Sequence, residues 1–333
     1  MGGLAVRAVN FLRLARRFLA AERGVALALV AICLSGFAGV TALVVDVGQL
    51  YETRRQLQSG ADAAALAGAA YLPDDPNRAI AAALEYAQRN GVEITEDDIE
   101  VYSTYVPDDT IRVNDRRNVS YGFARALGLT GSDVTAQATS VVGSMAGSMG
   151  CMPWALFPED PLPFGTLVTL KYNPLSNQGG NFGALAIDGP GAAPYREAII
   201  NGAWKRIRVG DWVDTETGNV AGPTKQGLQR LLQGDQTSFD DAVEVLDSGL
   251  MRVKMRGCPR IVIVPLIHAL PDGGKTSVEI IGFAYVFLVN YHFHAPTGEL
   301  TVDARFLKIV DPNGTWGPIG NADYGVRVPK LTQ

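Results

Sequence analysis

Residues 24–45 form an apolar stretch that contains neither a charged residue nor a proline. At ~1.5 Å per residue, a helix of about 22 residues covers the roughly 30 Å hydrocarbon core of a bilayer. The sequence therefore predicts a helix that crosses a membrane once, with residues 1–23 on one side and the rest of the chain on the other.

The residues on the two sides of this stretch differ in charge. Before it, Glu22 is outweighed by arginines, whereas Asp46 and the residues after it mix both signs. Lys and Arg near a membrane helix favour the cytoplasmic side. We therefore expect a single-pass protein of the cell membrane, with a cytoplasmic tail and an extracytoplasmic bulk. The arginines of the tail are Arg7, Arg13, Arg16, Arg17 and Arg23.

A cleaved signal peptide is the alternative interpretation of the apolar stretch. The apolar region of a signal peptide usually has about 7–15 residues and is closely followed by a small-residue cleavage site. Here the stretch is longer, and the alanine-rich cluster comes too late. The sequence favours an uncleaved signal anchor.

Residues 46–72 continue the helix without a breaker and become rich in alanine. One large and four small side chains at helical spacing share one face of this segment. Small residues let two helix backbones approach closely, so the face could pack against another molecule or against the protein's own globular part. Our working hypothesis is an intermolecular helix contact. Its residues are Leu57, Ala61, Ala64, Ala65 and Gly68.

The same segment carries a D-x-G-x-x-Y element, a basic pair, a Leu-Gln and an A-D-A-A-A-L-A-G-A run, in this order. In this it resembles the amino-terminal segment of TadE/TadG-like proteins of Flp (Tad) pilus assembly, over about Glu22 to Leu72. The resemblance implies an envelope protein linked to a pilus or a related secretion system, with other pilus subunits, assembly proteins and the membrane as partners. It implies no enzymatic activity for this segment. The residues that carry the motif are Asp46, Gly48, Tyr51, Arg54, Leu57, Gln58, Ala61 and Asp62.

The chain departs from larger TadG proteins in one respect. Those proteins often carry a von Willebrand A-type domain with a D-x-S-x-S metal site, and this sequence lacks that motif. The resemblance therefore implies a short member with a different outer domain, and the adhesive or metal-dependent role of the larger proteins is not carried over. Processing by a prepilin-type peptidase at Arg23-Gly24 stays open, although no acid follows where pilins usually carry Glu.

The remaining chain has the composition of a folded exterior. Across the whole sequence hydrophobic residues make up 47% and charged residues 19%, which argues against a long disordered exterior. The net charge of −5 argues against nucleic-acid binding, which needs a basic surface.

Hydrophobic periodicity and turn residues divide this exterior into three parts. Residues 73–142 predict a small, pilin-like α/β unit in the order α-β-β-α-β, with its first helix capped by Asp75. Residues 143–150, which are Gly, Ser, Met and Ala, predict a linker. Residues 151–333 predict a β-rich extracytoplasmic domain, because β-branched and aromatic runs alternate with Gly and Pro.

The clearest strand is predicted over residues 278–293. Its aromatic residues share one parity, and we expect that face to pack into a core. The aromatic residues are Phe283, Tyr285, Phe287, Tyr291 and Phe293.

The three cysteines differ in their surroundings. Cys33 lies in the apolar stretch, where a thiol is a small apolar group. Cys151 and Cys258 fall outside, where an oxidising compartment permits a disulfide. We expect them to pair, and two buried free thiols or a catalytic Cys are the alternatives.

The candidate catalytic and metal-binding residues match known motifs only in part. His292 and His294 share a strand face and could bind a metal with His268, and the acids between Gly210 and Thr224 could hold Ca²⁺. Residues 273–276 resemble the end of a phosphate loop but predict a hairpin turn with Pro271 and Asp272. We therefore expect no enzyme, no cofactor and no metal site.

Together these patterns predict an α+β protein: a tail (1–23), a transmembrane helix (24–45), an extended helix (46–72), an α/β unit, a linker and a β-rich domain. The expected function is a structural or assembly role in a Flp/Tad-type pilus or a related secretion system, as a minor pilin-like protein. The alternative is a membrane-tethered exported enzyme or a ligand-binding module of the envelope.

Overall fold

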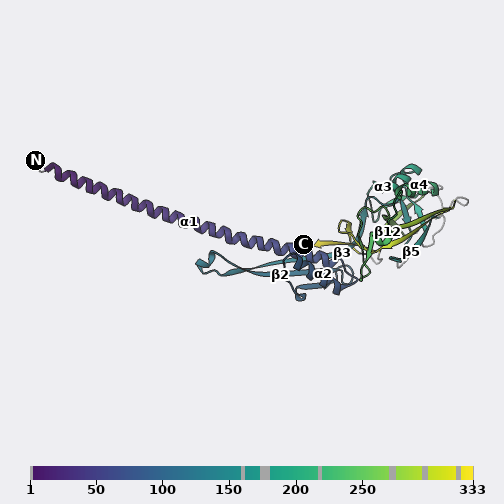
Figure 1. Cartoon of the computed structure of the whole chain (residues 1–333), viewed down its shortest axis with the longest axis horizontal. Coiled ribbons are helices and arrows are strands. Elements are labelled where there is room, and N and C mark those ends of the chain that lie inside the picture. The colour runs from purple at the N-terminus through teal and green to yellow at the C-terminus, as the bar shows by residue number, and fades with distance from the viewer. Residues whose placement is uncertain are drawn as a thin grey trace. The chain divides into compact units, whose positions relative to one another are not determined.

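The computed structural model of the chain is drawn in Figure 1, and it has two compact units. Unit 1 consists of Met1–Gln58 and Asp115–Ala136, and unit 2 of Ser59–Asn114 and Gln137–Gln333. Side chains are described from residue 25 onward, except those of residues 127, 172, 181 and 182. The structure describes residues 3–158, 162–172, 181–216, 220–269, 275–294, 299–319 and 324–332.

A single helix, α1 (Gly3–Ala69), contains both the apolar stretch and the alanine-rich segment. Its continuity is expected, because no proline interrupts the sequence. Among the described residues it is the one helix long and apolar enough to cross a membrane by length and composition, with a mean hydropathy of 2.4 in its most apolar window. None of that window is buried inside the protein. These side chains have no protein core to enter, which suits a helix surrounded by lipid.

The α/β elements that follow lie where the sequence predicts them. Helix α2 (Pro76–Arg89) begins after Asp75, whose Oδ1 accepts a hydrogen bond from the Arg78 N–H at 2.9 Å. The 3-10 turn η1 (Glu96–Asp98) leads into strand β1 (Ile99–Tyr102). The next elements are β2 (Thr110–Ser120), the 3-10 turn η2 (Ala124–Leu127) and β3 (Gly131–Ser148).

The predicted linker at residues 143–150 is wrong, because β3 runs through residues 143–148. In this part β3 pairs antiparallel with the carboxy-terminal strand β16 (Val326–Thr332) at Gly143 and Ser144, and with β15 (Thr315–Gly317) between Ser144 and Gly147. The small residues make room for a neighbouring strand: a Cβ on Gly143 would lie 2.2 Å from the Gly317 carbonyl oxygen. The glycine that suggested flexibility is required by close strand packing.

The division at residue 150 into two separate domains is also wrong, since one nine-stranded sheet draws on both predicted parts. Its order is β1-β2-β3-β16-β14-β10-β9, and β15 and β7 pair with β3. The remaining strands are β7 (Ile207–Arg208), β9 (Val243–Val245), β10 (Met251–Val253), β14 (Ile309–Val310) and β15 (Thr315–Gly317).

The second sheet has seven strands in the order β11-β4-β6-β5-β13-β12-β8. An additional pairing of β11 with β12 closes all of them except β8 into a ring, which leaves these strands without a free edge. Helices α3 (Ala192–Asn201), α4 (Ala221–Leu231) and α5 (Phe239–Ala242) complete unit 2. The strands are β4 (Trp154–Leu156), β5 (Leu167–Tyr172), β6 (Asn181–Ala184), β8 (Trp212–Asp214), β11 (Ile261–Ile267), β12 (Ser277–His294) and β13 (Glu299–Leu307).

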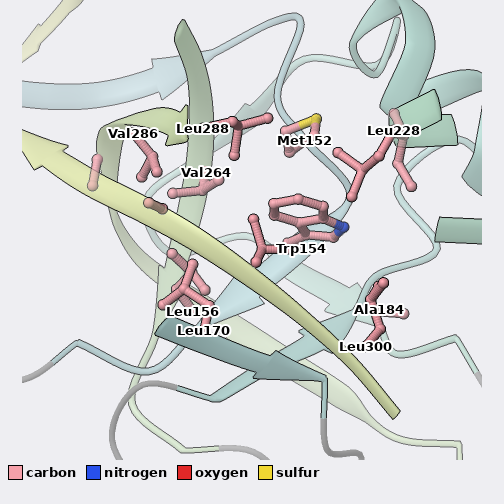
Figure 2. Close-up of a cluster of buried hydrophobic side chains, with 14 of the residues drawn as sticks. Met152, Trp154, Leu156, Leu170, Ala184, Leu228, Val264, Val286, Leu288 and Leu300 are labelled. Carbon is pink, nitrogen blue, oxygen red and sulfur yellow. The ribbon is translucent and has the colours of Figure 1, made fainter. Parts of the chain in front are cut away.

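A large hydrophobic cluster fills this ring around Trp154, which is completely buried (Figure 2). Its indole Nε1 donates a hydrogen bond to the Tyr195 hydroxyl at 3.1 Å. That hydroxyl lies 3.0 Å from Thr224 Oγ1, so helices α3 and α4 are tied to the core through a buried polar chain.

Strand β12 does not have one aromatic face, contrary to the prediction. Its pairing with β13 shifts register between Leu288 and Asn290, and this bulge exchanges the faces of the strand. Before the bulge, Phe283 and Phe287 pack outside the ring cluster. After it, Tyr291 and Phe293 pack against the ring cluster, so both faces of β12 contact apolar side chains.

Candidate membrane-proximal site

Asp46 joins α1 to the far end of the β2–β3 hairpin within unit 1. Its Oδ1 accepts the Gly122 N–H at 2.8 Å, and its Oδ2 accepts the Ala124 N–H at 2.7 Å. The Phe123 N–H lies between the two oxygens, at 3.2 and 3.1 Å. The carboxylate therefore binds three consecutive backbone N–H groups at the start of η2. We call residues 121–130 the hairpin tip.

The Asp46 carboxylate that makes this attachment is buried and ionised. Asp46 is 4% exposed although its neighbours on α1 face outward. The Ala124 N–H does most to lower the pKa of Asp46 below its ordinary value of 3.8; burial opposes the shift, and the N–H groups of Gly122 and Phe123 add to it. A carboxyl whose pKa is lower in the folded state contributes stability above its unfolded pKa and loses it as the pH falls. The attachment is therefore complete at neutral pH and weakens only in acid, below about pH 4.

The hairpin tip has the geometry that this attachment requires. Gly122 leaves room for the carboxylate, because a Cβ there would lie 3.3 Å from Asp46 Oδ1. Gly128 has φ of 85° and ends η2 in the left-handed region that glycine adopts easily. Farther along the hairpin, Arg117 donates a second hydrogen bond to α1, at 3.2 Å to Gln56 Oε1.

Residues 24–70 match the family model described as putative Flp pilus-assembly TadE/G-like. This amino-terminal segment is TadE/G-like. The match contains the apolar stretch and the whole Asp46 motif. Comparison of the chain with curated proteins and with solved structures gave no match. The apolar helix and the TadE/G-like segment together indicate a membrane-anchored protein related to pilus assembly.

The other motif residues of the TadE/G-like segment divide into exposed and buried positions. Tyr51 is 72% exposed, Arg54 is exposed, and a Cβ on Gly48 would meet nothing within 4 Å. Leu57 and Ala61 are fully buried, whereas Gln58 and Asp62 are half-buried. The carboxyl half of the motif therefore enters the protein interior, and the amino half, except for Asp46, faces outward.

The hypothesis that the small-residue stripe is an intermolecular contact is wrong, because the structure buries the stripe within the chain. A Cβ on Gly68 would lie 2.5 Å from Ile111 Cδ1 and 3.0 Å from the Ala79 carbonyl oxygen. The small side chains let α2 and the sheet approach α1, which is the intramolecular alternative considered for the sequence. The stripe residues are Leu57, Ala61, Ala64, Ala65 and Gly68.

The predicted disulfide between Cys151 and Cys258 is also wrong, since both thiols are free and buried. Cys151 lies in the cluster around Phe283, whereas Cys258 lies in the cluster around Phe287. Burial raises the pKa of the Cys151 thiol to about 12, which leaves it protonated and unreactive. Cys33 is free and exposed on the apolar part of α1.

The weak metal candidates are held in structural contacts. His292 Nε2 lies 3.2 Å from Asp303 Oδ2 on the exterior. Asp211 Oδ2 accepts the Arg208 N–H and Glu216 Oε1 accepts the Gly191 N–H, both at 2.8 Å, and these acids do not converge. No group of three or more His, Cys, Asp or Glu side chains suited to a metal occurs among the residues described above. The predicted hairpin turn at 271–274 lies outside the described residues, as do residues 217–219 of the acidic segment.

A pocket of about 280 Å³ opens in unit 2 beside strand β8. Trp212, His268 and Glu279 are among its lining residues, and Trp212 is 67% exposed. An exposed indole in a pocket that is lined by apolar residues and by a few polar ones offers a surface on which a sugar ring or a peptide could stack.

Replacing Asp46 by asparagine tests the attachment of the hairpin tip to the TadE/G-like segment. Asparagine keeps the size of the side chain but removes the charge and exchanges one acceptor for an N–H₂ donor. We expect several-fold faster amide hydrogen exchange at residues 122–124, measured by mass spectrometry on the full chain in detergent at pH 7. Glu52→Gln is the control, because it removes a carboxylate charge from the same helix at an exposed position, where Glu52 pairs with Arg55 and not with the hairpin tip. Unchanged exchange in Asp46→Asn contradicts the attachment.

Proposed function

We propose that the chain is a single-pass, membrane-anchored extracytoplasmic protein with a structural or assembly role in a Flp/Tad-type pilus or a related secretion system. The observation that carries the proposal is the TadE/G-like segment at residues 24–70, in which an exposed apolar helix leads into a folded exterior. The minor pilin-like role, the signal anchor and the partners among pilus subunits and assembly proteins are part of the same proposal.

The orientation in this proposal follows from charge. By the positive-inside rule, the arginines between Arg7 and Arg23 favour an amino terminus in the cytoplasm. The residues that follow Asp46 then lie outside. The acidic net charge of −5 argues against nucleic acid as a partner, because nucleic-acid binding needs a basic surface.

We also propose that the protein is not an enzyme. Asp211 and Glu216 accept hydrogen bonds from backbone N–H groups, and Asp214 is bonded to the Ser277 hydroxyl and the Lys275 ammonium group, which leaves these carboxylates poorly placed as acids or bases. In this proposal the β-rich part serves as a rigid surface for partners.

The proposal is tested in the native cells by deleting the chain and restoring it from a plasmid. We expect deletion to reduce surface filaments or secretion and restoration to return them. Mass spectrometry of sheared filaments then assigns the role: a chain that travels with the pilin is a filament subunit, and one that stays in the membrane fraction is an assembly factor. Normal filaments and secretion in the deletion strain overturn the proposal.

The pocket beside Trp212 favours a second candidate, a membrane-tethered module that binds a sugar or peptide. This candidate predicts that Trp212→Ala abolishes binding to a cell-wall glycan or peptide array while thermal unfolding of the chain is unchanged. Trp204→Ala is the matched control, because Trp204 is also exposed, at 72%, but is not among the described residues that line the pocket. Binding that survives Trp212→Ala contradicts this candidate.

A further inference from the structure

The hydrogen bonds of Asp46 fix the position of the hairpin tip along α1. Asp46 follows Val45, the last residue of the apolar stretch, and the next residue of a helix rises only ~1.5 Å. The N–H groups of Gly122, Phe123 and Ala124 are all bonded to this one carboxylate. The tip therefore lies level with the point where the apolar part of α1 ends, which is where a spanning helix leaves the hydrocarbon core.

The tip exposes large apolar side chains at this level. Phe123 and Leu129 are each 55% exposed, although both belong to a short turn with its own hydrogen bonds. The sequence from Tyr121 to Thr130 contains Arg125 but no acidic residue, in a chain of net charge −5. An apolar and basic surface suits the interfacial layer of a membrane with anionic headgroups.

Most backbone N–H groups of the tip have a hydrogen-bond acceptor within the protein. The Tyr121 N–H donates to the Thr130 carbonyl oxygen, and the Leu129 N–H donates to that of Ala124. The N–H groups of residues 126 and 128 donate within η2, and those of residues 122–124 donate to Asp46. Satisfied backbone groups lower the cost of approaching lipid, because unsatisfied ones lose their water.

We propose that the hairpin tip inserts Phe123 and Leu129 into the interfacial layer of the membrane that α1 crosses, with Asp46 as the positioning residue. The occupant of this surface is lipid, because the surface continues the apolar side of α1, where Val44 and Val47 are also exposed. The tip then gives unit 1 a second membrane contact beside the helix.

The proposal rests on the membrane anchor and is independent of the pilus role. A nitroxide spin label is attached to Phe123→Cys in the full chain, with Cys33 replaced by alanine, in vesicles of phosphatidylethanolamine and phosphatidylglycerol. Electron paramagnetic resonance then compares collisions of the label with oxygen, which concentrates in lipid, and with a water-soluble nickel complex. Leu129→Cys is labelled in the same way as a second position.

Thr135→Cys is the matched control. Thr135 is exposed on β3 of the same unit, and it lies five residue steps beyond Thr130, about 16 Å at ~3.3 Å per residue. This distance exceeds the interfacial layer, which is roughly 7 Å on each side of the hydrocarbon core.

We expect the ratio of oxygen to nickel collisions at positions 123 and 129 to exceed the ratio at position 135 several-fold. We expect Asp46→Asn to lower the ratio at 123 toward that of the control. Equal ratios at 123, 129 and 135 overturn the proposal and leave the tip in water, where a protein partner would be its occupant. A high ratio at 123 that Asp46→Asn leaves unchanged overturns the positioning role of Asp46.

Discussion

Replacing Trp154 by alanine is expected to lower the free energy of unfolding by about 3–5 kcal/mol, the usual cost of removing a buried aromatic side chain from a core. Trp154 is fully buried in the cluster that fills the closed ring of strands. Its loss removes apolar contacts on several strands and also the indole donor to Tyr195. Thermal unfolding of the full chain in detergent micelles, followed by circular dichroism, measures the effect.

Trp154→Phe separates the two contributions. Phenylalanine keeps much of the apolar volume but has no N–H, and the Tyr195 hydroxyl retains Thr224 as its partner. We expect a loss of about 1 kcal/mol from the missing hydrogen bond, well below that of the alanine variant. Both variants are expected to stay in the membrane fraction, because α1 is unchanged. Equal destabilisation by the two variants would contradict the prediction, because it would show that the apolar volume of Trp154 contributes little to stability.

The sequence predicts those elements whose signal is local. The helix that follows Asp75 is predicted from its cap and its periodicity and is found as α2, and the strands of the small α/β unit are found as β1, β2 and β3. In contrast, the carboxy-terminal strand β16 has no hydrophobic alternation strong enough to predict its place beside β3. Strand pairing depends on packing between distant segments, which a single sequence does not contain.

Two further wrong predictions, the single aromatic face of β12 and the linker at 143–150, have physical reasons. A period-2 pattern assumes that each residue faces opposite to the last, and an extra residue near Val289 breaks this assumption. Glycine has the same sequence signal in a flexible linker as in a strand that needs room, and only the nearby Gly317 carbonyl and Trp316 indole distinguish the two cases at Gly143.

The candidate site could be predicted in part. The motif directs attention to Asp46, but its partners lie 76 to 78 residues away in the hairpin tip. The glycines at 122 and 128 are the available signal for a tight turn, and nothing in the sequence connects that turn with an acid on α1. For the small-residue stripe, the sequence allows packing against the same chain or against another molecule, and the structure shows burial within the chain.

Replacing Gly68 by leucine tests the packing of this stripe within the chain. In the structure a Cβ at Gly68 already lies 2.5 Å from Ile111 Cδ1 and 3.0 Å from a backbone oxygen of α2. We expect a loss of about 3 kcal/mol, at the upper end of the usual cost of overpacking, because the backbone oxygen cannot move away without displacing α2. The same unfolding measurement in micelles checks this, together with the abundance of the protein in cells.

Gly48→Leu is the matched control on the same helix. Both variants replace a helical glycine by leucine, which raises the helix propensity by roughly 0.8 kcal/mol. In contrast to Gly68, a Cβ at Gly48 meets nothing within 4 Å. We therefore expect Gly48→Leu to unfold no earlier than the unchanged protein, whereas Gly68→Leu unfolds earlier and accumulates less. If Gly68→Leu kept full stability and abundance but lost pili, the stripe would be an intermolecular contact after all. If pili are lost only in proportion to abundance, the stripe acts through the stability of the chain.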